Sequence, residues 1–231
     1  MYKKIVRFGA VGLTLYALLY GLGCTLPRVG DLEQTSRNLF YHVPMWFTMY
    51  LMMALSFYWS VRALKSQALA DDARAKDAAE VGVLFGLLGL FTGVVWSRVT
   101  WGQLMRDSNP AAWWSWDPKQ TGALVAVMMF AAYFVLRNSV PEAGKRLRLA
   151  GVYNIFAVFA LFPLTFVIPR MLDSLHPGGD EGNPLFPKDV SADYRMVFYP
   201  SIAGFFCLAL WVWELRYRTS LLHLRAWESG H

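Results

Sequence analysis

Residues 81–97 read VGVLFGLLGLFTGVVWS, a stretch that contains no charged side chain. A helix that crosses a lipid bilayer needs about 20 predominantly apolar residues, and the apolar stretch extends to that length over residues 80–98. It is also rich in glycine, which allows close packing between helices in a membrane. The stretch therefore predicts a transmembrane helix that packs tightly against its neighbours.

Five further stretches have the same character, over residues 5–26, 43–63, 118–137, 149–168 and 197–217. Hydrophobic residues make up 56% of the chain and charged residues only 16%, whereas soluble domains carry about 25% charged residues. The first stretch follows Lys3, Lys4 and Arg7, as in a signal peptide, but it is longer than a signal core and lacks a clear cleavage site. We therefore predict an all-α polytopic membrane protein, with six transmembrane helices in one domain over residues 1–231.

The distribution of positive charge predicts the orientation of these helices, because Lys and Arg are retained on the cytoplasmic side. Six crossings place both termini on the same side as loops 64–79 and 138–148. That side holds fourteen of the 22 Lys and Arg residues and seven of the 16 Asp and Glu residues. We expect both termini to be cytoplasmic. The net charge of +6 then reflects topology, and no nucleic-acid-binding motif accompanies it.

The outer loops, over residues 27–42, 99–117 and 169–196, carry the unusual residues. Residues 111–121 read AAWWSWDPKQT, with Trp113, Trp114 and Trp116 next to Asp117. Tryptophan is enriched at membrane interfaces, which suffices for Trp96 but explains such a cluster less well than a binding surface does. Asp117 and the Pro118 that follows it are typical of a helix start, and Gln at position 120 can complete a capping box.

Two histidines are expected on the same outer side as the tryptophan cluster. His42 lies in LFYHVPMWF, at the start of the second apolar stretch, and His176 lies in MLDSLHPGG, beyond the end of the fifth. Each alone could be an interfacial histidine with a structural role. A zinc ion usually takes four protein ligands, whereas haem iron takes one or two axial ligands and its ring needs an aromatic surround. The combination favours haem, with propionate partners among Arg98, Arg106, Lys119 and Arg170.

The segment WWSWDPKQT resembles the tryptophan-rich "WWD" segment of the haem-handling proteins of cytochrome c maturation, a superfamily that includes CcmC, CcmF and CcsA. The chain length, the six apolar stretches, and the pair YHVPMW and SLHPGG are similar to the CcmC family. This resemblance implies that His42 and His176 are the axial ligands of haem b iron. It further implies that the ring of the haem is contacted by a tryptophan-rich set of residues: Trp101, Trp113, Trp114, Trp116 and Asp117.

The resemblance implies a function in haem transport, without catalysis, in the bacterial inner membrane. Haem would bind on the periplasmic side and pass to a haem chaperone of the CcmE type. The implied membrane partners are ABC transporter subunits of the CcmA and CcmB type and a small CcmD-type protein. The alternatives are a cytochrome c haem lyase of the CcsA or CcmF type, a b-type cytochrome and a haem-free assembly scaffold. No histidine lies within a predicted span, which argues against the lyase and the cytochrome.

Overall fold

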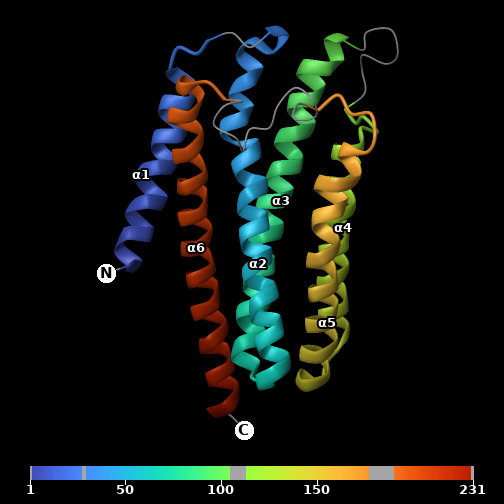
Figure 1. Cartoon of the computed structure of the whole chain (residues 1–231). Helices are drawn as coiled ribbons and strands as arrows, with labels where there is room; N and C mark the ends of the chain where they lie inside the picture. Colours follow the sequence, from blue (N-terminus) through green and yellow to red (C-terminus); the bar gives the residue numbers. More distant parts are fainter. Residues whose placement is uncertain (1, 28–29, 105–112, 177–189, 230–231) are drawn as a thin grey trace.

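The computed structural model describes residues 2–27, 30–104, 113–176 and 190–229, and within these ranges the chain is helical with no strand (Figure 1). The long helices are α1 (Tyr2–Gly23), α2 (His42–Ser66), α3 (Leu69–Leu104), α4 (Pro118–Ser139), α5 (Ala143–Phe162) and α6 (Ala192–Ser229). Shorter helical segments are η1 (Gly30–Phe40), the π-helical η2 (Pro163–Val167) and η3 (Ile168–Arg170). The predicted all-α class is confirmed.

The six long helices run alternately up and down in one bundle, and the two termini lie at the same end (Figure 1). α2 packs along α3, α1 along α6, and α4 along α5. Each of the six apolar stretches found in the sequence overlaps one of these helices. The start of α2 and the end of α5 therefore meet at the end of the bundle opposite the termini.

Among the described residues, five helices are long and apolar enough to cross a membrane: α1, α3, α4, α5 with its extension to Arg170, and α6. α2 has the length, with 25 residues, but it carries the fully buried polar residues Thr48, Ser56 and Ser60. These polar groups bond within the protein, since Asn154 of α5 donates to the hydroxyls of Ser56 and Ser60. α2 contacts α3, α5, α6 and η1, so it faces protein on several sides. Its role as a sixth crossing stays a prediction.

A row of glycines on α3 determines how closely α2 and α3 approach. A Cβ atom added at Gly82 would lie 2.9 Å from Met53, and one at Gly86 would lie 2.5 Å from Met49. The row continues along α3 toward the end of the bundle opposite the termini, where a Cβ atom at Gly89 would lie 2.9 Å from the Trp46 indole nitrogen. Residues three and four apart share one face of a helix, so large side chains of α2 occupy the space above successive glycines of α3.

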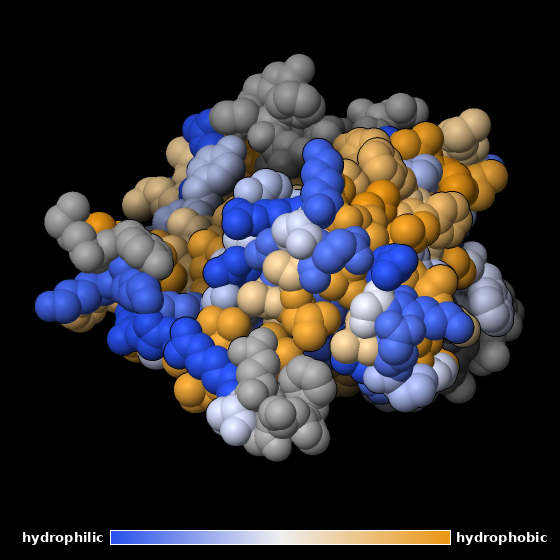
Figure 2. All heavy atoms as spheres, turned by 90° about the horizontal axis from the view of Figure 1, so that it is seen from below, coloured by the Kyte–Doolittle hydropathy of each residue, from blue (hydrophilic) through white to orange (hydrophobic). Residues whose placement is uncertain are grey.

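The end of the bundle that carries the termini is held by ion pairs, and Figure 2 shows hydrophilic side chains gathered there between apolar flanks. Arg137 of α4 donates two hydrogen bonds, of 2.7 and 2.6 Å, to the Asp72 carboxylate of α3. Both side chains are buried, and bidentate pairs of arginine with a carboxylate are among the strongest hydrogen-bonded ion pairs. Lys3 pairs with Glu214 at 2.7 Å and joins α1 to α6.

We predict that Gly89→Ala lowers the thermal stability of the protein in detergent or nanodiscs. The new methyl group would displace the rigid Trp46 ring, and such overpacking costs roughly 1–3 kcal/mol, more than the gain of about 1 kcal/mol from replacing a helical glycine. Gly12→Ala in α1 is the matched control, because no atom lies within 4 Å of the position of its Cβ. Equal shifts in the two melting temperatures would contradict this account of the α2–α3 contact.

Candidate functional site

A pocket lies at the end of the bundle opposite the termini, where α2, α3, α4 and the extension of α5 meet. Its volume is about 170 Å³, less than the roughly 300–1,000 Å³ of pockets that enclose a drug-sized ligand. A large ligand would therefore be only partly enclosed by it. Its lining is mostly apolar and aromatic, with two imidazoles and two cations: His42, Val43, Trp46, Phe47, Tyr50, Leu90, Gly93, Ser97, Trp101, Lys119, Gln120, Ala123, Thr165, Phe166, Arg170 and His176.

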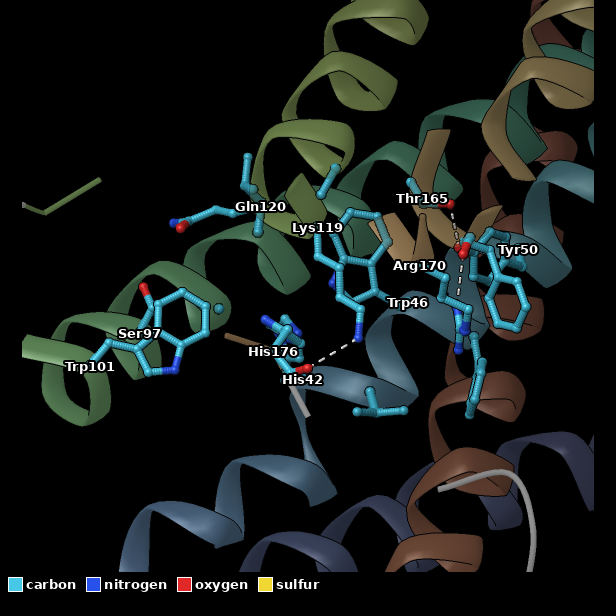
Figure 3. Close-up of a pocket in the computed structure, with 16 residues that line it drawn as sticks. His42, Trp46, Tyr50, Ser97, Trp101, Lys119, Gln120, Thr165, Arg170 and His176 are labelled. Carbon is cyan, nitrogen blue, oxygen red and sulfur yellow. Dashed lines mark hydrogen bonds between the residues drawn. The ribbon is translucent and has the colours of Figure 1, made fainter. Parts of the chain in front are cut away.

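The two histidines singled out from the sequence meet in this pocket. Their ring centroids are 5.9 Å apart, with 45° between the ring planes. Figure 3 shows the two rings together at the centre of the pocket, with Trp101 and Ser97 on one side and Tyr50 and Arg170 on the other. The rings come from segments far apart in the sequence, and their separation is short enough for one metal ion between them to reach both.

His42 is held firmly by α3. Its Nδ1 lies 2.9 Å from the Gly89 carbonyl oxygen and 3.2 Å from the Thr92 hydroxyl. A carbonyl oxygen can only accept, so Nδ1 carries the proton and Nε2 keeps its lone pair. The ring also lies against Gly93, where an added Cβ would be 2.7 Å from His42 Cε1. A backbone acceptor on the far nitrogen is the usual arrangement of a metal-binding histidine.

His176 lies in an irregular segment beyond η3, and its ring is surrounded by aromatic rings. The centroids of Trp96 and Trp101 are each 5.6 Å from that of His176. Its Nδ1 is buried and has no hydrogen-bond partner among the described residues. The backbone N–H of His176 donates to the Ser174 hydroxyl over 3.2 Å, so the ring is positioned through its own short segment.

Asp117 connects the start of α4 to the segment that carries His176. As predicted, it is the N-cap of α4, because Oδ1 accepts from the backbone N–H of Lys119 at 2.9 Å and from that of Gln120 at 3.4 Å. Oδ2 accepts from the Ser174 hydroxyl at 2.8 Å and from the Leu175 N–H at 2.9 Å. The expected capping box is replaced, since Gln120 Oε1 accepts from the Ser115 hydroxyl at 2.6 Å.

The predicted tryptophans are placed differently from one another. Trp101 is buried and lines the pocket. Trp113 and Trp116 are 63% and 79% exposed and lie outside the pocket lining, with Trp114 packed edge-on against Trp116. Arg98 lies over the Trp113 ring at 5.7 Å. The cluster thus forms an exposed aromatic surface next to the cap of α4, and its contact with haem stays a prediction.

Two of the four cations considered from the sequence line the pocket. Lys119 Nζ donates to the His176 carbonyl oxygen over 3.5 Å. The Arg170 guanidinium lies 3.6 Å over the Phe166 ring and donates to the Phe166 carbonyl oxygen over 2.8 Å. Arg98 is not among the lining residues, and Arg106 lies outside the described residues. Among the described residues, Lys119 and Arg170 are therefore the two of these cations that share the pocket lining with the two imidazoles.

The same pocket includes a π-helical turn, η2, which carries Thr165 into the lining. The Tyr50 hydroxyl lies 2.5 Å from Thr165 Oγ1, which itself donates to the Leu161 carbonyl oxygen over 2.7 Å. An added Cβ at Gly122 of α4 would clash with the Leu164 carbonyl oxygen of this turn. Single π turns inside helices are frequent at functional sites, and here the turn brings α5 against the start of α4.

The alternative of a zinc site built wholly from protein ligands finds no support in the part of the chain that the structure describes. No group of three or more His, Cys, Asp and Glu side chains with ligand geometry occurs there. Among the described residues that line the pocket, the donor set is two imidazoles without a carboxylate or a thiolate. This set fits the two axial positions of an iron whose other four ligands come from a porphyrin.

The chain is similar to known proteins of one family over nearly its whole length. The model of the family "Heme exporter protein C" (CcmC) matches residues 2–229 of the chain. The chain belongs to this family. Heme exporter protein C of Paracoccus denitrificans is 30% identical over 226 residues, which cover 94% of the chain and 85% of that protein. The Rhodobacter capsulatus protein of the same name is 29% identical, with 92% and 84% covered.

A second group of relatives matches a shorter region. The cytochrome c biogenesis protein CcsA of Prochlorococcus marinus is 39% identical over 82 residues, which cover 36% of the chain and 23% of that protein. The likeness noted between the sequence and both groups is therefore confirmed. Membership of the heme exporter protein C family rests on nearly the whole chain. The likeness to CcsA rests on about a third of the chain.

Sequence reasoning missed several residues that line or contact this pocket. Trp46 and Tyr50 line the pocket from α2, and Trp96, assigned to an interfacial belt, packs against His176. Helical spacing offered a signal for the first two, since Trp46 follows His42 by one turn and Tyr50 by two. A comparable signal for Trp96 was its position three residues after Gly93, on the helix that receives His42.

The two imidazoles are expected to be neutral at physiological pH. Burial lowers the pKa of His42 to about 4. Burial, aided by His42 and Lys119, lowers the pKa of His176 to about 3. The ordinary value for histidine is about 6.5, so we predict that neither ring titrates between pH 7 and pH 5 in the folded protein without haem. ¹⁵N NMR of histidine-labelled protein in nanodiscs measures this directly.

The same shifts have a consequence for stability. The unfolded chain takes up protons on these histidines near pH 6.5 while the folded chain does not, so folded-state stability is lost as the pH falls from about 6.5 toward 4. Replacing both histidines by Gln should flatten that loss. Titration of both rings near pH 6.5 in the NMR experiment would show that the pocket is open to water.

Proposed function

We propose that this chain binds haem b with its iron between His42 and His176 and passes it to an acceptor protein. The observation that carries the proposal is the meeting of the two imidazoles, 5.9 Å apart, in a pocket with aromatic walls. Both rings are held neutral by burial, which is the form that binds metal. The name of the family, heme exporter protein C, supports haem as the ligand.

The position of the pocket supports delivery on the periplasmic side. With six crossings, α2 being the sixth, both termini would lie on one side of the membrane, and the start of α2, which carries His42 of the pocket, would lie on the other (Figure 1). Most Lys and Arg residues belong to the terminal end, which we assign to the cytoplasm of a bacterial inner membrane. Haem bound at the outer end would be accessible to a periplasmic chaperone of the CcmE type, through the exposed surface that Trp113 and Trp116 form beside the pocket.

The word exporter in the family name supports assembly with transporter subunits, which we assign to the CcmA and CcmB type with a small CcmD-type protein. The lyase alternative has less support, because the match to CcsA covers only 36% of the chain. Non-enzymatic haem transfer requires the residues of this pocket to bind haem, to orient it and to let it go. None of these steps needs a nucleophile or a general base.

Wild-type protein loaded with haem is predicted to give the absorption spectrum of six-coordinate, low-spin iron, with a pyridine haemochrome of the b type. His42→Ala and His176→Ala should each abolish that spectrum and reduce retained haem about tenfold or more, since each removes an axial ligand. His223→Ala, at an exposed position near the end of α6, is the control. Unchanged spectra in both site variants would overturn the ligand assignment.

Lys119 and Arg170 are predicted to bind the haem propionates. Lys119→Gln and Arg170→Gln should each weaken haem binding by roughly 10–100-fold, because charge-assisted hydrogen bonds contribute about 1.5–3 kcal/mol. The same substitutions should leave the affinity for iron protoporphyrin dimethyl ester, which lacks the two carboxylates, almost unchanged. Arg98→Gln is the matched control, since Arg98 lies outside the pocket. Equal losses for haem and for the ester would exclude a role at the propionates.

A further inference from the structure

The two histidines of the pocket are supported in very different ways. His42 belongs to the first turn of α2, and its ring is bonded to the Gly89 carbonyl oxygen of α3. The ring also rests on Gly93, where there is no space even for a methyl group. Withdrawal of His42 would therefore break the bond to Gly89, and the backbone of His42 is fixed in α2, which packs extensively along α3.

His176 packs its ring against Trp96 and Trp101, but within the described residues its ring has no hydrogen bond like the one between His42 and Gly89. It follows η3 in an irregular segment, and its Nδ1 has no hydrogen-bond partner in the described part of the chain. Its known polar contacts are made by its backbone, to the Ser174 hydroxyl and to Lys119. Departure of His176 would therefore break packing against Trp96 and Trp101 but no described hydrogen bond of the ring.

One carboxylate holds this segment in place. Asp117 is buried, with 8% of its surface exposed, and its two oxygens have separate tasks. Oδ1 caps α4, while Oδ2 accepts from Ser174 and Leu175, the two residues that precede His176. An asparagine could still cap the helix through its single oxygen, but its NH₂ group would then face two donors. The carboxylate is thus required for the contact to the His176 segment and not for the cap.

Resting on the proposed function, in which both histidines bind the iron, we propose that His176 is the ligand that leaves when haem is handed over. His42 stays bound until then. Asp117 is the positioning residue that sets how readily His176 leaves, acting through Ser174 and Leu175. In this exchange the bond from iron to His176 Nε2 breaks, and the lone pair of a ligand from the acceptor takes its place. His176 departs as neutral imidazole, so no proton or electron is transferred.

The test measures ligand exchange on full-length, haem-loaded ferric protein in nanodiscs. Cyanide is added in excess, and its binding is followed by stopped-flow absorption, because the rate is limited by loss of the weaker axial ligand. Ser174→Ala removes the hydroxyl that donates to Asp117 and accepts from the His176 backbone N–H, and it leaves the helix cap intact. We expect it to raise the rate by roughly tenfold or more, because two hydrogen bonds that hold the segment are lost. Asp117→Asn should raise the rate at least as much.

Three further variants make the result specific. Ser174→Thr keeps the hydroxyl and should exchange cyanide at the wild-type rate. Ser139→Ala removes an exposed hydroxyl at the other end of the bundle and serves as the control. Thr92→Val loosens His42 instead of His176, and we expect it to change the rate far less than Ser174→Ala does.

The outcomes separate this inference from the proposal on which it rests. A larger acceleration by Thr92→Val than by Ser174→Ala would make His42 the departing ligand and overturn the inference. Unchanged rates in both Ser174→Ala and Asp117→Asn would also overturn it, because the contact to Asp117 would then not control exchange. A wild-type spectrum without two histidine ligands, by contrast, would refute the proposed function itself.

Discussion

The close approach of α2 to the glycine face of α3 is the constraint on which the site depends. Gly82, Gly86, Gly89 and Gly93 leave space for successive side chains of α2, and the last of these is His42. Between apolar helices in a membrane, packing of this kind contributes more to association than the hydrophobic effect does. The contact that joins the two central helices therefore also orients one imidazole of the pocket and fixes its tautomer.

A second constraint brings the later part of the chain to the same place. Asp117 begins α4 and at the same time bonds the segment before His176, while the π turn of α5 packs against Gly122 of α4. The start of α4 thus contacts both the α5 extension and the segment that carries the second histidine, and the tryptophan segment leads directly into it. This arrangement suits the proposed role as a haem carrier, with His42 in α2 and His176 in an irregular segment.

The helices were predictable from the sequence because long apolar stretches have few alternatives to helix in a membrane. The cap at Asp117 was predictable because it depends on local chemistry. The meeting of His42 and His176 was only partly predictable. The predicted topology places both histidines on the same side of the membrane, but their contact depends on glycine spacing in α3. The orientation of Trp113 and Trp116, which are exposed, and the inclusion of Trp46 and Trp96 around the histidines depend on tertiary packing that no local pattern encodes.

The most direct test of the account is an electron cryo-microscopy structure of the haem-loaded protein in a lipid nanodisc. The account predicts one haem at the end of the bundle opposite the termini, with its iron bonded to Nε2 of His42 and Nε2 of His176. His42 Nδ1 should remain bonded to the Gly89 carbonyl oxygen. Haem bound elsewhere, or an iron ligated by neither of these histidines, would contradict the central claim.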